Sequence, residues 1–109
     1  MQKINVKPLS INEAFKGRRF KTPEYLVYER EVLLSLKFIK LRPGPYGLFI
    51  ELGLSNKGAD IDNPIKLISD ILQKKFGFND KDIYELYVKK KIVKKGEEYF
   101  YFSITYLQN

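Results

Sequence analysis

Residues 60–83 read DIDNPIKLISDILQKKFGFNDKDI, and this stretch decides the fold that we expect. Apolar residues recur every three or four positions over residues 65–76, which predicts a helix with one buried face. Asn63 and Pro64 are typical of a helix start, with Asn63 as the N-cap, and Gly77 is typical of a helix end. The helix therefore lies between two acidic segments.

Strands are expected on both sides of this helix. Residues 46–55 and 83–93 alternate between apolar and other side chains over much of their length, which predicts strands. Residues 98–107 alternate after the turn at residues 94–97, and residues 3–8 form a short alternating run. The side chains expected to share a buried face are Leu48, Ile50, Leu52 and Leu54 in one strand, and Phe100, Phe102, Ile104 and Tyr106 in another.

A second helix is expected from residue 24 to about residue 38, because Thr22 and Pro23 form a typical helix start. Residues 9–22 have no clear period and are expected to form a loop. The element order is then β-α-β-α-β-β. We expect one α+β domain over residues 1–109, with a small mixed β-sheet and two helices packed on one face.

Composition limits the chemistry that this chain can perform. The chain contains 20 Lys and Arg against 13 Asp and Glu, a net charge of +7. This excess favours an anionic partner, with nucleic acid first and acidic lipid second, although solubility alone also explains it. The chain has no Cys and no His, which excludes disulfides, thiolate zinc sites, Cys nucleophiles and His general bases. Catalysis must therefore use carboxylates, Lys, Tyr or metal-bound water.

The same sequence argues against a membrane location. No apolar run reaches the roughly 18 residues that a membrane span needs. The first residues, Met1 to Asn5, do not begin a signal-peptide core. We therefore expect a cytoplasmic protein with no membrane partner.

The acidic residues around the helix form a pattern with a chemical meaning. Asp60 and Asp62 are two residues apart, so an extended segment points them the same way. Lys66 and Asp70 follow at intervals of four, which places them on one helix face with Asp62. Asp80 joins them only if the next strand begins beside the strand that ends near Asp60. Crowded carboxylates repel unless a cation neutralises them, so this pattern predicts a magnesium site.

Ordinary structural roles explain the same residues. Asp62 can stabilise the start of the helix, where its dipole favours acids. Lys66 can pair with Asp62 and Asp70 along the helix. Asp80 and Asp82 can be plain turn residues. The spacing alone does not separate these roles from a metal site.

Residues 60–72 and 77–83 resemble the motif of the RusA family of Holliday junction resolvases. That motif is D-x-D-N-x-x-K, then D-x-L, then a Gly-containing turn and two acids before a hydrophobic residue. Residues 8–12 and 94–97 also resemble the family's opening and closing segments, so the resemblance spans nearly the whole chain. It implies a magnesium-dependent endodeoxyribonuclease, with Mn²⁺ as a substitute ion, that acts as a homodimer on four-way DNA junctions in recombination and repair.

The resemblance also implies residue roles. The residues that match the family's essential set are Asp60, Asp62, Lys66 and Asp80. The three acids among them are implied as metal ligands, and Asp70 matches a further recurring acid. Asn79-Asp80 stands where the family usually has two adjacent acids. Counting back from Ile83 places Asp80 on the second of these, and Asp82 is the alternative.

Two basic runs are expected to contact DNA phosphates. One lies in the loop at residues 9–22, where Phe15 and Phe20 either wedge into the branch point or anchor the loop. The other lies on the strand at residues 83–93, where alternation sends Lys90 to the opposite face from its neighbours. The residues expected to bind DNA are Lys16, Arg18, Arg19, Lys21, Lys89 and Lys91.

Other interpretations remain open at this point. Sheet packing explains Tyr84, Tyr87, Tyr99 and Tyr101 as well as contacts with DNA or a second subunit do. The main alternative to a nuclease is a non-catalytic basic nucleic-acid-binding module with the same fold. A further alternative is a protein-interaction domain whose basic face meets an acidic partner.

Overall fold

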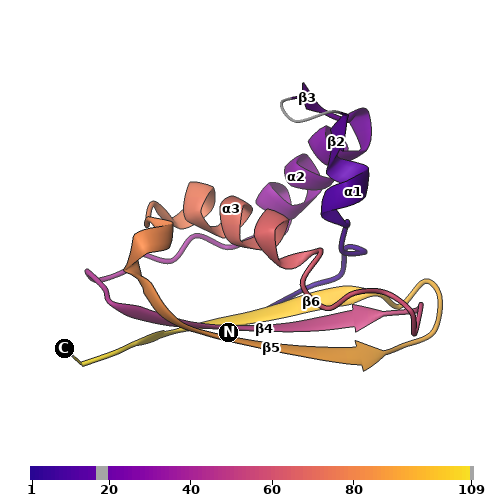
Figure 1. The fold of residues 1–109 in the computed structure, drawn as a ribbon. Helices are drawn as coiled ribbons and strands as arrows, with labels where there is room; N and C mark the ends of the chain where they lie inside the picture. The colour runs from indigo at the N-terminus through magenta and orange to yellow at the C-terminus, as the bar shows by residue number, and fades with distance from the viewer. Residues whose placement is uncertain (17–19, 109) are drawn as a thin grey trace.

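The computed structural model describes residues 1–16 and 20–108 and shows a four-stranded mixed sheet with helices on one face (Figure 1). The expected α+β class with a small mixed sheet is confirmed. The elements in chain order are β1 (Gln2–Ile4), α1 (Ile11–Ala14), β2 (Phe15–Lys16), β3 (Phe20–Lys21), α2 (Pro23–Ser35), β4 (Tyr46–Leu54), α3 (Ile65–Phe76), the 3₁₀ turn η1 (Asp80–Asp82), β5 (Ile83–Ile92) and β6 (Tyr99–Tyr106).

The element order departs from β-α-β-α-β-β within residues 9–22. These residues were expected to form a loop, but they contain α1 and the two short strands β2 and β3, which pair with each other. Ala14 of α1 is fully buried, and the Phe15 ring contacts the Tyr25 ring edge-on at 5.4 Å between centroids. The segment is therefore anchored on the core. Its elements have two to four residues each, too few to show a period in the sequence.

The start of α2 follows the sequence prediction. The Thr22 hydroxyl accepts a hydrogen bond from the Tyr25 backbone N–H at 3.2 Å, and Pro23 occupies the first turn. The helix ends at Ser35, and its Tyr28 and Val32 side chains are buried. With 13 residues, α2 is too short to cross a membrane, and no other helix in residues 1–16 and 20–108 qualifies.

The helix α3 has the buried face that its period predicts. Gly77 ends it in the left-handed conformation, with φ of 74°, as expected. The start of α3 differs from the prediction, because Pro64 rather than Asn63 occupies the cap position and no side chain caps the helix. Asn63 is instead engaged with the preceding loop. The buried residues of α3 are Ile65, Leu67, Ile68, Ile71, Leu72 and Phe76.

The sheet has the strand order β1-β6-β4-β5. β4 pairs in parallel with β5 and antiparallel with β6, and β6 pairs antiparallel with β1. The helix-facing residues of β4 and β6 form the centre of the core together with the buried face of α3. These sheet residues are Leu48, Ile50, Leu52, Leu54, Phe100, Phe102 and Ile104.

The parallel pairing decides where the acidic residues lie. Ile83 at the beginning of β5 is opposite Tyr46 at the beginning of β4, and both strands end together at Ile92 and Leu54. Asp80 was expected to join the other acids only if β5 began beside the end of β4. The two strands instead begin side by side, so this condition is not met. A parallel pair needs a crossover connection. Here α3 supplies it by running back over the sheet, so Asp80 lies at the end of α3 remote from the loop that precedes it.

Candidate functional site

A groove lies between α3 and β5, and three of the four residues of the expected essential set line it. Asp62, Lys66 and Asp80 line this groove, whose volume is about 360 Å³. All three side chains are exposed. The other residues that line the groove are mainly apolar, namely Leu48, Ile61, Ile65, Ile83, Leu86 and Val88, with Ser69 as the polar exception. The groove thus combines an apolar lining with two acids and one base.

The two acids of the groove come from different ends of the β-α-β unit. Asp62 lies in the loop before α3, and Lys66 lies in the first turn of that helix. Asp80 begins η1 immediately before β5. Because β5 runs parallel to β4, Asp80 lies where β5 begins, and the loop with Asp62 follows the end of β4. The acids therefore approach the groove from opposite ends.

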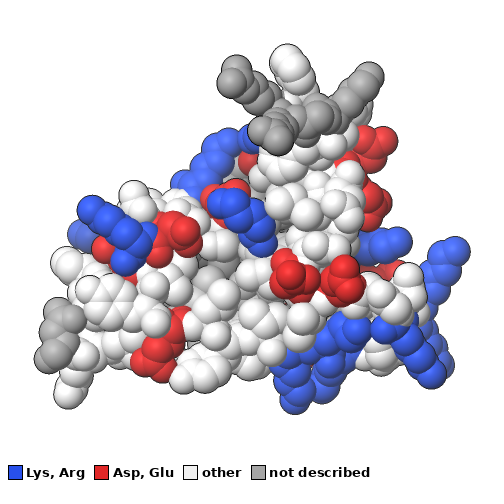
Figure 2. Space-filling model, viewed as in Figure 1, with Lys and Arg blue, Asp and Glu red and all other residues white. Residues whose placement is uncertain are grey.

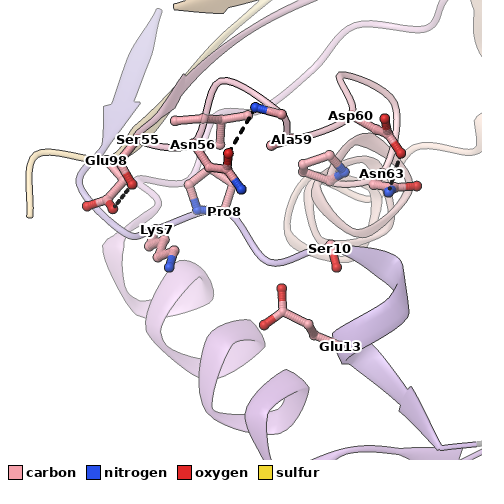
Figure 3. Close-up of a pocket in the computed structure, with 13 residues that line it drawn as sticks. Lys7, Pro8, Ser10, Glu13, Ser55, Asn56, Ala59, Asp60, Asn63 and Glu98 are labelled. Carbon is pink, nitrogen blue, oxygen red and sulfur yellow. Dashed lines mark hydrogen bonds between the residues drawn. The ribbon is translucent and has the colours of Figure 1, made fainter. Parts of the chain in front are cut away.

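Asp60 lies outside this groove, on a neighbouring polar pocket (Figure 3). Its carboxylate accepts a hydrogen bond from the Asn63 side-chain amide at 3.2 Å. In residues 1–16 and 20–108, no three Asp, Glu, His or Cys side chains form a group that could hold a metal ion. The structure therefore does not bring Asp60, Asp62 and Asp80 together, and these residues do not fit a single centre of three carboxylates.

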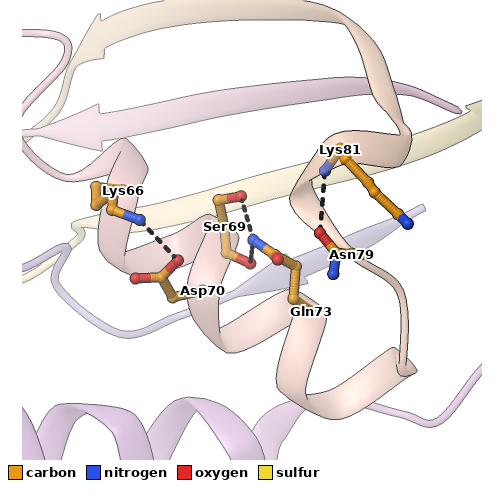
Figure 4. A network of polar contacts seen from close by, with 6 residues as sticks. All are labelled: Lys66, Ser69, Asp70, Gln73, Asn79 and Lys81. Carbon is orange, nitrogen blue, oxygen red and sulfur yellow. Dashed lines mark hydrogen bonds and ion pairs between the residues drawn. The ribbon is translucent and has the colours of Figure 1, made fainter.

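Lys66 is paired with Asp70 on the exposed side of α3 (Figure 4). The distance from Lys66 Nζ to Asp70 Oδ1 is 3.2 Å, and the two side chains are 63% and 40% exposed. This is the helical ion pair that ordinary structural roles also predicted. An exposed pair of this spacing contributes about 0.3–0.5 kcal/mol, so a phosphate in the groove can compete for the Lys66 ammonium.

The turn before β5 separates Asp80 from Asp82. The Asn79 carboxamide oxygen accepts a hydrogen bond from the Lys81 backbone N–H at 3.1 Å and so caps η1 (Figure 4). Asp82 lines a different hollow, shared with Arg42. Asp80, rather than the alternative Asp82, is therefore the acid of this turn that lines the groove with Lys66.

Lys90 has a role that the sequence did not reveal. Its ammonium donates hydrogen bonds to the backbone carbonyls of Lys57 at 3.2 Å and of Ala59 at 2.8 Å. These contacts tie the loop before Asp60 to β5. The alternation of the strand predicted that Lys90 is on the opposite face from Lys89 and Lys91. It did not predict which of the two faces packs against the helices.

Lys89 and Lys91 lie on the opposite side of the sheet from the groove. Leu86 and Val88 line the groove, and alternate residues of a strand point to opposite faces. The two lysines therefore cannot contact a DNA phosphate that is bound beside Asp62. The expectation that Lys89 and Lys91 contact DNA therefore stays a prediction, and it concerns the sheet face opposite the groove.

The other predicted DNA contacts are basic residues within residues 16–21 of the sequence. Arg18, Arg19 and the Lys16 side chain lie outside the described residues. The Lys21 ammonium is 3.4 Å from a Glu29 carboxylate oxygen. Phe20 is 73% exposed, whereas its partner in the sequence prediction, Phe15, is anchored on the core as described above.

Charged side chains are unevenly distributed on the face seen in Figure 2. Basic side chains gather below the ends of β4 and β5, and acidic side chains lie beside them near the loop that leads into α3. Positive potential next to a pair of acids favours a polyanion that also contacts the acidic site. On this face, acidic side chains near the loop that leads into α3 thus border a basic surface.

Glu98 is a buried acid in the described part of the chain, and it closes the polar pocket that contains Asp60. Its carboxylate accepts hydrogen bonds from the Ser55 hydroxyl at 2.8 Å and the Gly96 backbone N–H at 2.7 Å. Its own backbone N–H, the Ser55 hydroxyl and the Gly96 N–H lower the pKa of Glu98, with a smaller contribution from Lys7. These contacts favour the charged form and indicate a structural role.

Searches against models of known protein families and against curated proteins found no match for this chain.

Proposed function

We propose that this protein is a magnesium-dependent endonuclease of branched DNA, of the RusA type, and that the groove between α3 and β5 is its active site. The observation that carries the proposal is that Asp62, Lys66 and Asp80, which match the family motif, line one groove. The net charge of +7 supports an anionic substrate. The substrate that we propose is a four-way DNA junction.

Asp62 and Asp80, the acids of the motif that line the groove, would hold magnesium, each at its own end of the groove. Mg²⁺ takes one or two carboxylates and completes its shell with water and phosphate oxygens, so it does not require three acids in one group. Asp62 and Asp80 line the groove, and Asp60 lies in the same loop as Asp62. When bound, the ion supplies an activated water and stabilises the leaving oxygen. Mn²⁺ has the same ligand preference and is proposed as a substitute.

Lys66 and Lys90 contribute in different ways. The Lys66 ammonium would offset the charge that develops on the phosphate during cleavage, because its exposed pair with Asp70 is weak. Lys90 acts at a distance by holding the loop through the carbonyls of Lys57 and Ala59. Phe20, exposed on the hairpin, is available to contact the branch point.

Paired cuts in a junction need two active sites, because the junction has two-fold symmetry. We propose a homodimer as the arrangement that supplies them. Exposed aliphatic side chains on α2, namely Leu26, Val27 and Leu34, offer an apolar surface for the second subunit. Sedimentation analysis should show a dimer that Leu34→Glu converts to a monomer. A monomeric wild-type protein at the concentrations that cut DNA would contradict this part of the proposal.

The proposal is tested with a synthetic four-way junction and a linear duplex of the same sequence, each incubated with Mg²⁺, with Mn²⁺ or with a chelator. We expect paired nicks in the junction that require the metal. Asp62→Asn and Asp80→Asn should abolish cleavage and keep or improve junction binding, because a negative charge near phosphate is removed. Full-rate cleavage by both variants would show that the groove is not the active site.

A non-catalytic nucleic-acid-binding module is the second candidate. The observation that favours it is that no group of three acids forms among the residues that the structure describes. This candidate predicts binding that weakens steeply with salt but yields no product with either metal ion. The same incubation therefore separates the two functions.

A further inference from the structure

The sheet face opposite the helices is not covered by any element of residues 1–16 and 20–108 (Figure 1). We call it the open face. Its residues follow from the register, since Leu48 and Leu52 point toward the helices and their neighbours point the other way. Six residues of this face carry the inference, namely Phe49, Tyr87, Tyr101, Lys3, Lys89 and Lys91.

Three aromatic rings cross the open face from β5 to β6. Tyr87 pairs with Phe49 across the parallel strands. The Phe49 ring in turn contacts the Tyr101 ring, with centroids 6.1 Å apart and planes at 65°. Tyr87 is 58% exposed, and the other two rings are partly exposed. The three rings therefore form an aromatic strip with a solvent-accessible surface.

Lysines lie on both sides of this strip. Lys89 and Lys91 are on the edge strand β5, and Lys3 is on the opposite edge strand, paired with Tyr101. The open face also carries two acids, and both are engaged by tyrosines. The Tyr99 hydroxyl donates to Glu51 at 2.6 Å, and the Tyr87 hydroxyl donates to Glu85 at 2.7 Å.

We propose that the open face binds single-stranded nucleic acid. Unpaired bases would stack on Phe49, Tyr87 and Tyr101, and the phosphates would contact the lysines at the two edges. An aromatic sheet surface with basic edges suits this ligand because every base has a flat π face, which a duplex keeps within its own stack. The proposal goes beyond junction cleavage and does not depend on the groove.

A second copy of the chain is the alternative partner for the open face. A self-complementary interface here would remove Lys3, Lys89 and Lys91 of both copies from water. Among the described residues, this face has three lysines but only two acids, Glu51 and Glu85, so two copies face to face would leave ammonium groups without a carboxylate partner. Phosphates satisfy the lysines directly. The charges of the face therefore favour nucleic acid over a second subunit.

The first test measures binding of a labelled oligothymidine of about ten nucleotides by fluorescence anisotropy, without divalent metal. Tyr87→Ala should weaken binding by about 5-fold to 150-fold, the effect of losing one stacked base. Tyr87→Phe keeps the ring and should bind like the wild type. Tyr84→Ala is the matched control, because Tyr84 is 67% exposed on the same strand but lines the hollow that also contains Asp82 and Phe76. It should change binding by less than about 2-fold.

The lysines are tested through the salt dependence. Each phosphate contact contributes about −0.7 to the slope of log K against log salt for a single strand. Lys89→Gln and Lys91→Gln should each reduce the slope by about that amount, and Lys81→Gln, near the groove, should not. NMR chemical shifts of the wild-type protein provide a test that needs no variant. Adding the oligonucleotide should change the shifts of residues on the open face.

Several outcomes would overturn the proposal. One is equal binding of the duplex and the single strand; another is an equal effect of Tyr87→Ala and Tyr84→Ala. A third is a dimer that Tyr87→Ala dissociates without changing oligonucleotide binding, which would make this face a subunit interface. The variant with both Asp62→Asn and Asp80→Asn should bind the oligonucleotide like the wild type, so failure of the groove and failure of this face are distinguishable.

Discussion

The two faces of β5 carry opposite kinds of chemistry although their residues alternate along one strand. On the helix side, Leu86 lines the acidic groove and Lys90 holds the loop. On the open side, Tyr87 and Lys89 lie on an aromatic and basic surface that no element of the described residues covers. A run of consecutive lysines is therefore two separate features. Odd and even positions of the strand point to opposite faces of the sheet, so the position of a residue decides which ligand it can contact. The local density of charge does not decide this.

The largest effect that separates the faces is on DNA cleavage. Asp62→Asn or Asp80→Asn should reduce junction cleavage by about 100-fold or more, because each removes a charged group from the proposed active site. Asp60→Asn should reduce junction cleavage by less, because Asp60 lines the neighbouring pocket rather than the groove. Lys89→Gln, on the open face, should leave the single-turnover rate at saturating protein within about 2-fold of the wild type. An equal loss in all four variants would contradict the division between the faces.

The open face depends on a close approach between two strands. A Cβ atom added at Gly53 would lie 2.2 Å from the Tyr99 ring, so this ring packs directly over the glycine. Gly53→Ala should therefore lower the free energy of unfolding by about 1–3 kcal/mol through overpacking. Gly58→Ala is the matched control, because the nearest atom there is 3.4 Å away. Urea unfolding of both variants measures the difference, and equal stabilities would be evidence against this packing.

The contacts of Lys90 give a smaller and more local effect. Lys90→Met should loosen the loop before Asp60, because two carbonyls lose a charged donor, at a cost of about 1 kcal/mol. Hydrogen exchange should show faster exchange at residues 57–62 than in the wild type. Lys91→Met, on the other face, should leave this loop unchanged. Unaltered exchange in both variants would show that Lys90 does not position the loop.

The smallest effect concerns pH. The hydrogen bonds to Glu98 lower its pKa in the folded protein. A lowered pKa contributes stability above the unfolded pKa, and this contribution is lost as the pH falls through the folded pKa. Wild-type stability should thus decline below about pH 4.5, and Glu98→Gln should flatten that decline. Thermal unfolding between about pH 3 and 7 tests this, and parallel curves would exclude Glu98 as a contributor.

Long periodic segments could be predicted from the sequence. The buried face of α3, the left-handed Gly77 and the helix-facing residues of β4 all follow from local patterns. The segment at residues 9–22 could not be predicted, because elements of two to four residues show no period. The prediction that Asn63 caps α3 was wrong, because the Asn63 side-chain amide donates a hydrogen bond to Asp60 instead.

The candidate site could be predicted only in part. The resemblance to the RusA motif indicated Asp60, Asp62, Lys66 and Asp80, and the structure places the last three of these on one groove. The separation of Asp60 and the approach of Asp80 from the far end depend on the parallel pairing of β4 and β5. Pairing between strands is a long-range property that spacing along the chain does not encode. The role of Lys90 in holding the loop before Asp60 likewise could not be predicted, because it depends on which face of the sheet Lys90 is on.

The central claim is that the groove between α3 and β5 holds the divalent ion that cleavage requires. The most direct measurement is the broadening of backbone amide NMR signals by substoichiometric Mn²⁺. We predict that signals at Asp62, Lys66 and Asp80 broaden first, that excess Mg²⁺ reverses the effect, and that Lys89 and Tyr101 on the open face are spared. Broadening centred on Glu98 or the open face, or no selective broadening at all, would contradict the claim.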